Sequence, residues 1–296
     1  MYELVHITGQ SYYIQSPAKI GLVRLDSESE AANVCLIDSG NDKEAGRRVK
    51  KVLDNNNWKL RAIYNTHSHA DHIGGNKYLQ NNTGCKIYAP GIECAFTRHT
   101  LLESAFLFGG CPVNELRHKF LTAQESGSEY LTQDNLPEGF ELINLHGHSF
   151  DMAGFRTPDD VIYLADCLSS RETLDKYKIV VIYDVGEYLA TLEKVKTLNA
   201  NYFVPAHADL TDNIYDLAQY NINHVNNIAE DIIAICREAL NFERILQNLF
   251  TKYNLNMNFE QYVLTGSTIK SFLSWLKTQG RLNAYFENNI LLWESN

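Results

Sequence analysis

The stretch IYNTHSHADHIGGN, residues 63–76, holds four potential metal ligands within six positions. They are His67, His69, Asp71 and His72, and they directly follow an apolar run. Two histidines that are two residues apart beyond a strand can point at one locus, and the aspartate and histidine after them can point at a second. Four such side chains are costly to leave unpaired beneath a fold, and two cations would satisfy them. The stretch therefore predicts half of a two-metal site rather than a histidine-rich surface turn.

Three later positions supply further ligands, since one loop holds too few for two metals. Each of them lies where a strand is predicted to end: His148 in NLHGHSFD, Asp166 in VIYLADCLSS and His207 in FVPAHAD. Strand ends at one edge of a sheet can bring distant residues together on rigid supports. We therefore expect these side chains to meet the ligands of the opening stretch.

Up to about residue 210 the chain alternates short apolar strands with helical stretches. The patterns at 20–26 and 33–40 predict strands, and residues 43–56 follow a helical period. Residues 152–167 predict a hairpin whose turn is the sequence TPDD. This alternation is typical of an α/β domain.

After residue 210 the strand alternation stops. Residues 213–250 predict two helices, 267–280 predict another, and the following RLNAYFENNILLWES predicts a small hairpin. Three helices and a two-stranded wing are in the order of a winged helix-turn-helix unit. We therefore predict two domains, residues 1–210 and 211–296.

With these positions in place, the chain resembles the metallo-β-lactamase superfamily of metal-dependent hydrolases. The opening stretch contains the T-H-x-H-x-D-H-x-G-G-N signature of that family, and the later positions match its Gly-His-Ser turn, its strand-closing aspartate and its final Ala-His. The resemblance covers about residues 1–210. It implies an α/β fold, an αββα sandwich of two mixed sheets flanked by helices. Residues 211–296 would add a helical, winged-helix-like appendage.

The resemblance also implies how the two metals are held. One would be bound by His67, His69 and His148, a second by Asp71, His72 and His207, and Asp166 would bridge them together with a water or hydroxide. Histidine and carboxylate ligands without a thiolate suit zinc, which the family ordinarily binds, and also iron or manganese. Two cations lower the pKa of the shared water, so that a hydroxide forms near neutral pH and attacks the substrate. In the family's logic Asp71 is both a ligand and the catalytic residue that orients this nucleophile.

Four side chains are candidates for substrate binding. His146 stands where many relatives have proline, and it is either a pocket residue or an exposed histidine on a turn. Arg171, like Lys176, can bind an anionic group or belong to a solvated helix face. Phe106 and Phe108 lie in an apolar insertion, residues 94–112. That insertion predicts either a lid that favours a substrate with an apolar portion, or a helix that packs on the core or on a second subunit.

Composition narrows the partners and the compartment. The net charge of -10 and the pI near 5.5 disfavour nucleic acid as the main partner, and acidic residues also outnumber basic ones after residue 211. The C-terminal unit is therefore expected to shape the cleft or a homodimer interface. The first residues show no cationic leader before an apolar core, and no apolar run reaches the roughly 20 residues of a membrane span. Six scattered cysteines without a C-x-x-C pair indicate reduced thiols, so we expect a cytoplasmic protein that contacts no membrane.

These observations favour a binuclear hydrolase that acts on an ester, thioester, lactone or amide of a small molecule. One alternative is a nuclease of the same superfamily, which would use the same metals on a phosphodiester. Another is a non-catalytic sensor module, which should have lost ligands, whereas all seven positions match. The sequence after Asp166 differs from that of glyoxalase II relatives and of signal-quenching lactonases, so neither specific activity is favoured.

Overall fold

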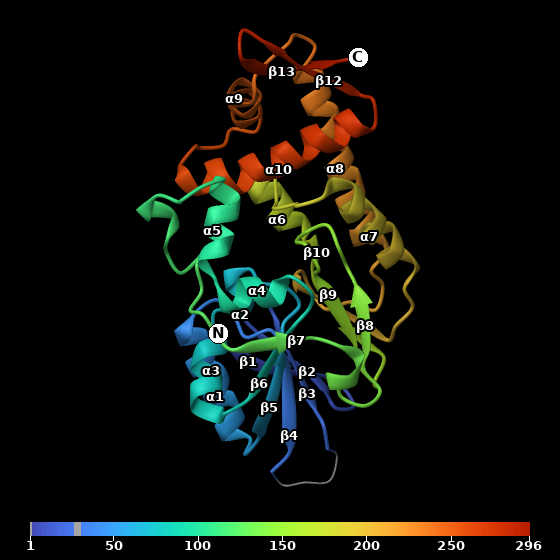
Figure 1. Cartoon of the computed structure of the whole chain (residues 1–296). Coiled ribbons are helices and arrows are strands. Elements are labelled where there is room, and N and C mark those ends of the chain that lie inside the picture. The colour runs from blue at the N-terminus through green and yellow to red at the C-terminus, as the bar shows by residue number, and fades with distance from the viewer. Residues whose placement is uncertain (1, 27–30) are drawn as a thin grey trace.

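The computed structural model of this protein describes residues 2–26 and 31–296 (Figure 1). Its strands are β1 Glu3–Thr8, β2 Ser11–Gln15, β3 Ile20–Arg24, β4 Asn33–Ile37, β5 Lys59–Tyr64, β6 Lys86–Ala89, β7 Ser128–Tyr130, β8 Glu141–Asn144, β9 Ala153–Arg156, β10 Val161–Ser169, β11 Tyr202–His207, β12 Leu282–Glu287 and β13 Ile290–Ser295. Its α-helices are α1 Lys43–Asn55, α2 Ala70–Ile73, α3 Asn76–Thr83, α4 Glu93–Arg98, α5 Leu101–Phe108, α6 Arg171–Tyr177, α7 Val185–Thr197, α8 Tyr215–Ile235, α9 Phe242–Lys252 and α10 Phe259–Thr278.

Two mixed sheets lie face to face between helices. The first sheet has the order β1-β2-β3-β4-β5-β6-β7, antiparallel up to β4 and parallel from there on. The second has the order β11-β10-β9-β8, with β10 and β11 parallel and the other neighbours antiparallel. Helices α1 and α3 pack on the outer face of the first sheet, and α7 and α8 lie on the other side of the second (Figure 1). The predicted αββα sandwich is therefore confirmed.

Strand β4 shows why the apolar runs of this chain form buried strands. Its alternate residues Val34 and Leu36 pack into the cluster under α1, whereas Cys35 and Ile37 pack into the cluster between the two sheets. Successive side chains of a strand point to opposite faces. Because both faces are covered, the strand is a continuous apolar run rather than an alternating one.

The hairpin predicted over residues 152–167 is confirmed by the antiparallel pair β9 and β10. Asp160 in its turn has a φ of 58°, a left-handed conformation that aspartate tolerates better than most residues. Strand β10 then continues beyond the hairpin to Ser169 and carries Asp166 to the edge where the other ligand candidates lie.

The C-terminal part follows the predicted order of three helices and a hairpin. In the turn between β12 and β13, Asn288 and Asn289 both have positive φ, as a type I′ turn requires. Helix α10 begins well before the predicted position 267, because Asn258 caps it by accepting a hydrogen bond from the main-chain N–H of Gln261. Gly266 lies inside the helix and is buried.

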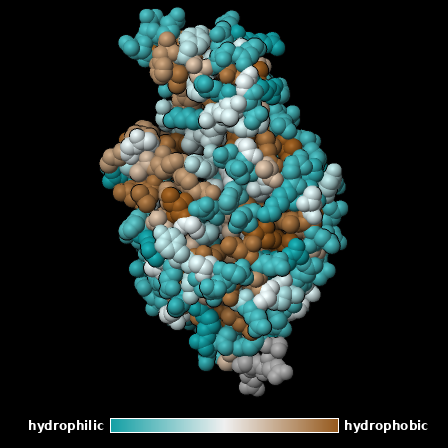
Figure 2. All heavy atoms as spheres, turned by 45° about the vertical axis from the view of Figure 1, so that its right-hand side comes forward, coloured by the Kyte–Doolittle hydropathy of each residue, from teal (hydrophilic) through white to brown (hydrophobic). Residues whose placement is uncertain are grey.

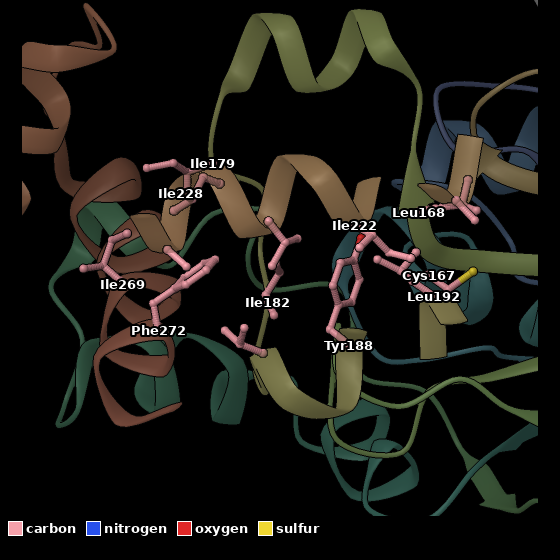
Figure 3. Packing of buried hydrophobic residues seen from close by; sticks show 14 of the residues in the cluster. Cys167, Leu168, Ile179, Ile182, Tyr188, Leu192, Ile222, Ile228, Ile269 and Phe272 are labelled. Carbon is pink, nitrogen blue, oxygen red and sulfur yellow. The ribbon is translucent and has the colours of Figure 1, made fainter. Parts of the chain in front are cut away.

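One hydrophobic core crosses residue 210. Tyr188 and Leu192 of α7 pack with Ile222 of α8, and the same cluster includes Ile269 and Phe272 of α10 (Figure 3). Because of these contacts, the C-terminal helices share one hydrophobic cluster with the second sheet and with α7. The boundary between two domains at residue 210 remains a prediction. Among the helices of the described residues, none is long and apolar enough to cross a membrane.

Candidate metal centre

All seven ligand candidates lie together at one end of the inner layers. His67 and His69 occupy the loop after β5, Asp71 and His72 belong to α2, His148 follows β8, Asp166 is in β10 and His207 ends β11. They form two groups. Within each group, the ligand atoms all lie within 4.8 Å of one another. The first group is His67, His69 and His148, and the second is Asp71, His72, Asp166 and His207.

Asp166 lies between the two groups. Its Oδ1 is 3.1 Å from Nε2 of His72, and its Oδ2 is 3.3 Å from Nε2 of His207. The same Oδ2 is 3.6 Å from Nε2 of His148, a member of the first group. A carboxylate in this position can reach a cation in either group.

The other ring nitrogen of four histidines faces an oxygen of the protein. Nδ1 of His148 lies 2.9 Å from the carbonyl oxygen of Val181, and Nδ1 of His207 lies 3.2 Å from that of Pro17. Nδ1 of His72 is 2.7 Å from Oδ2 of Asp38, and Nδ1 of His67 is 2.9 Å from Oγ1 of Thr66. Because carbonyl and carboxylate oxygens only accept, Nδ1 of His72, of His148 and of His207 carries a proton, and Nε2 of each ring is the atom that faces the centre.

Three buried atoms test whether these residues fit a metal. Within the described part of the chain, Nε2 of His67, Nε2 of His72 and Oδ1 of Asp166 form no hydrogen bond, although the last two atoms lie 3.1 Å apart. Buried polar atoms are rarely left unpaired, because each one costs free energy. A cation between them would pair all three, so the histidine and aspartate clusters fit a metal site.

The ionisation of the site is set by burial and by its own charges. Burial lowers the pKa of His67 and of His69, and lowers the pKa of His148 to about 4, so these rings are neutral and ready to bind a metal. The Asp166 carboxylate outweighs burial at His207 and raises the pKa of that ring to about 10. A cation must therefore displace a proton from His207 at neutral pH.

Gly147 allows the turn that carries His148 into the site. Its φ is 112°, a conformation that favours glycine, and an added Cβ would lie 2.2 Å from the main-chain nitrogen of Tyr188. The close approach between this turn and α7 therefore requires the glycine of the Gly-His pair.

Three buried acids of the site were missed by the sequence analysis. Asp38 follows β4, Glu93 begins α4, and Glu103 lies on α5 inside the apolar insertion. Oε1 of Glu103 is 3.7 Å from Nε2 of His69, and burial raises the pKa of its carboxyl to about 8. Their roles depend on which loops meet in space, and no spacing in the sequence shows that.

Glu93 joins the two loops that carry the first group. One carboxylate oxygen accepts hydrogen bonds from the main-chain N–H and the hydroxyl of Ser68, at 3.0 and 2.5 Å. The other accepts from the hydroxyl of Ser149 at 2.8 Å and from the main-chain N–H of Asp151 at 3.1 Å. Ser68 separates His67 from His69, and Ser149 follows His148, so one side chain sets the spacing of three ligands.

Glu93→Ala should therefore destabilise the protein by about 3 kcal/mol, because several buried donors lose their acceptor together. Thermal unfolding of the metal-depleted protein measures this without a contribution from bound metal. Glu129→Ala, at an exposed glutamate whose ion pair with Lys86 spans 3.6 Å, is the control and should change the melting temperature little. Equal melting temperatures for the two variants would contradict the role given to Glu93.

Two cavities adjoin the cluster. On the face shown in Figure 2, hydrophobic residues gather at the surface in the middle of the molecule. The metal cavity, about 690 Å³, is lined by Asp71, Asp166 and His207 and also by Lys176. The second cavity, about 570 Å³, is lined by Phe106. His146, Arg171 and Phe108 are not among the described residues that line either cavity, and the Arg171 guanidinium lies over the Tyr220 ring. The four substrate assignments remain predictions.

Two mixed sheets between helices, with a histidine and aspartate cluster at the strand ends, define an αββα protein with a candidate metal site. Residues 19–207 match the model of the metallo-beta-lactamase superfamily, and the chain belongs to that superfamily.

Curated relatives match only parts of their own length. The chain is 22% identical over 201 residues to the Beta-lactamase-like protein 2 homolog of Drosophila melanogaster. The matched stretch covers 67% of this chain and 62% of that protein. The chain is also 28% identical over 123 residues to Hydroxyacylglutathione hydrolase GloC of Haemophilus influenzae. That match covers 42% of this chain and 55% of that protein. The chain thus spans less than two thirds of the length of each.

A solved structure has the same fold over almost the whole chain. The Beta-lactamase domain protein from Burkholderia ambifaria superposes with a TM-score of 0.79 at 14% identity. The superposition covers 99% of this chain and 94% of that one, so the fold likeness includes the C-terminal helices.

Proposed function

We propose that this protein is a hydrolase that holds two divalent cations, with zinc as the expected metal, and cleaves an ester, thioester, lactone or amide of a small molecule. The observation that carries the proposal is the pair of ligand groups with three unpaired buried atoms between them. The name of the Haemophilus influenzae relative describes a hydrolase of an acylated thiol, which supports the acyl class of substrate.

The proposed assignment gives each of the seven residues a role. His67, His69 and His148 hold one cation, Asp71, His72 and His207 hold the other, and Asp166 is shared. Bound cations would supply Lewis acidity and a water that loses its proton near neutral pH. Asp71 has a side chain that is 40% exposed and lines the metal cavity, so its carboxylate can orient the attacking water and accept a proton from it.

The charge of the metal cavity bears on the alternatives. Besides the ligands it is lined by the acids Glu103 and Glu172 and by a single lysine or arginine, Lys176, among the described residues. A phosphodiester backbone binds through several cationic side chains. The nuclease alternative therefore receives less support than an acyl substrate, for which one cation suffices to anchor a carboxylate.

The test joins metal content with a substrate panel. Plasma mass spectrometry of the purified protein should give about two metal equivalents per chain. The loaded protein should hydrolyse at least one member of a panel of aryl esters, lactones and acyl thioesters at least about 100-fold faster than bis(p-nitrophenyl) phosphate. Phosphodiester cleavage without acyl hydrolysis would replace the proposal with the nuclease. Metal near zero after reconstitution would favour the non-catalytic module.

A further inference from the structure

The second cavity lies beside the metal cavity and shares part of its wall. His69, Glu103, His148 and Val181 line both. Two of these four are ligand candidates of the first group. A substrate whose reacting bond lies at the metals can therefore extend one of its ends into the second cavity.

One wall of the second cavity is aromatic. Phe106 of α5, Phe150 and Tyr183 form a cluster with ring centroids 5.1 Å apart for the two phenylalanines and 4.1 Å apart for Phe150 and Tyr183. Phe106 is 42% exposed and Tyr183 is 41% exposed, although both belong to the packed cluster. Their uncovered ring faces would be removed from water by an apolar ligand, and that burial is favourable.

Three hydroxyl groups of α10 in the lining of this cavity have donors that are already used. The Ser267 hydroxyl donates to the carbonyl of Leu264 at 2.9 Å, and the Ser271 hydroxyl donates to that of Tyr183 at 2.7 Å. The Thr278 hydroxyl donates to the carbonyl of Ser274 at 3.0 Å. Because these donors are paired within the protein, these three hydroxyls do not require a polar ligand.

The charged side chains of this cavity also have contacts elsewhere. The Lys270 ammonium lies 5.0 Å from the ring centroid of Phe242, a residue that is not among the described lining residues. Asp184 caps α7 by accepting from the main-chain N–H of Glu187. The metal cavity contains Asn41, Thr173, Lys176 and Gln261, which suit a polar leaving group. Both linings are more apolar than polar, so what distinguishes the second cavity is its cluster of three aromatic rings beside the first ligand group.

We propose that the second cavity binds the acyl portion of the substrate, and that the preferred substrates are esters or thioesters of aromatic or medium-chain carboxylic acids. This inference rests on the proposed function, since it names the substrate class of the same site. It makes Phe106 a specificity-determining residue and assigns α5 and α10 to substrate recognition.

A series of thioesters with one small polar leaving group tests the proposal. The N-acetylcysteamine thioesters of acetic, butyric, hexanoic and phenylacetic acid differ only in the acyl portion. For the metal-loaded protein, kcat/KM should rise about fourfold per added methylene. Phe106→Ala should lower the ratio of the phenylacetyl to the acetyl value about tenfold. Leu102→Ala, an exposed apolar residue of the same helix outside both cavity linings, is the matched control and should keep the wild-type ratio.

A second variant guards against an effect on folding. Ser274 is exposed and lines the cavity, so Ser274→Phe should fold and should fill the space from the α10 side. It should lower kcat/KM for the phenylacetyl and hexanoyl substrates more than for the acetyl substrate. Equal losses for all four substrates in this variant would contradict the acyl site.

Binding of a neutral apolar probe gives a readout that needs no metal. Trp275 lines the cavity, so 4-phenyl-1-butanol should shift the tryptophan emission of the metal-depleted protein. The shift should be lost in Trp275→Phe and weakened in Phe106→Ala. Two results would overturn the acyl site and leave the proposed hydrolase intact. One is that the probe causes no shift in emission. The other is that the protein hydrolyses the acetyl thioester but shows the same kcat/KM for every acyl group of the series. If the loaded protein hydrolyses no acyl substrate, the proposed function fails and the acyl site fails with it.

Discussion

Asp166→Ala is expected to leave the protein unable to retain two metals and to lower hydrolysis at least about 1,000-fold. The carboxylate is within 3.6 Å of a ring nitrogen from each of three histidines, and these belong to both ligand groups. Alanine removes a side chain that reaches both groups. Plasma mass spectrometry of the purified variant gives the metal content, and the best acyl substrate of the panel gives the rate.

A control separates this loss from a general disturbance of the strand ends. His146→Ala changes another histidine two residues before a ligand candidate, at a position outside both cavity linings in the described structure. It should keep both metals. Loss of a metal from His146→Ala would show that the His148 position is assigned wrongly. Undiminished turnover in Asp166→Ala would exclude the shared role of Asp166.

The alternation of strands and helices and the seven candidate positions were within reach of the sequence because they follow local rules, whereas the αββα sandwich was implied by the resemblance to the superfamily. A spacing of two residues beyond a strand constrains where His67 and His69 point, and strand ends in one sheet share an edge. The hairpin of β9 and β10 has a turn with its own sequence pattern. Such features depend on neighbouring residues, so a single sequence contains them.

The partners of the ligands were out of reach because they come from elsewhere in the chain. Asp38 is 34 positions from His72, and Glu93 is 25 positions from Ser68. Buried acids of this kind are recognised only when the donors around them are known, and those donors are set by tertiary packing. Nothing in the residues around Glu93 distinguishes it from a glutamate in the first turn of an ordinary surface helix.

The substrate candidates show a related limit. Phe106 and Phe108 are two positions apart on α5, and on a helix such residues point in well-separated directions. Only one of them can face a given cavity, and the choice depends on how α5 packs on α10. Leu107 buries against Val263 of α10, which fixes the rotation of the helix and turns Phe106 to the second cavity. The sequence contains both phenylalanines but not this rotation.

The second prediction of large effect concerns Asp38, a 3% exposed residue with a φ of 65°. Its Oδ1 accepts from the main-chain N–H of Thr66 at 2.8 Å. Its Oδ2 accepts from the Thr66 hydroxyl at 2.8 Å and from Nδ1 of His72 at 2.7 Å. Because the Thr66 hydroxyl donates to Asp38, it can accept from Nδ1 of His67. One carboxylate therefore sets the tautomer of one histidine in each ligand group.

Asp38→Asn should weaken the binding of both metals together, by about 10- to 100-fold. Asparagine has the same size and tolerates the left-handed backbone. Its NH₂ group, however, would face groups that donate hydrogen bonds to the aspartate, and an NH₂ group cannot accept them. If that group lies at the Oδ2 position, His72 and His67 must carry their protons on Nε2, where the cations would bind, as when an asparagine replaces a triad aspartate. Competition with a chelator measures the affinities. Asp160→Asn is the matched control, since Asp160 also has a left-handed φ of 58° but lies in the β9–β10 turn. Loss of affinity for one metal with the other unchanged would show that Thr66 does not relay the effect of Asp38 to His67.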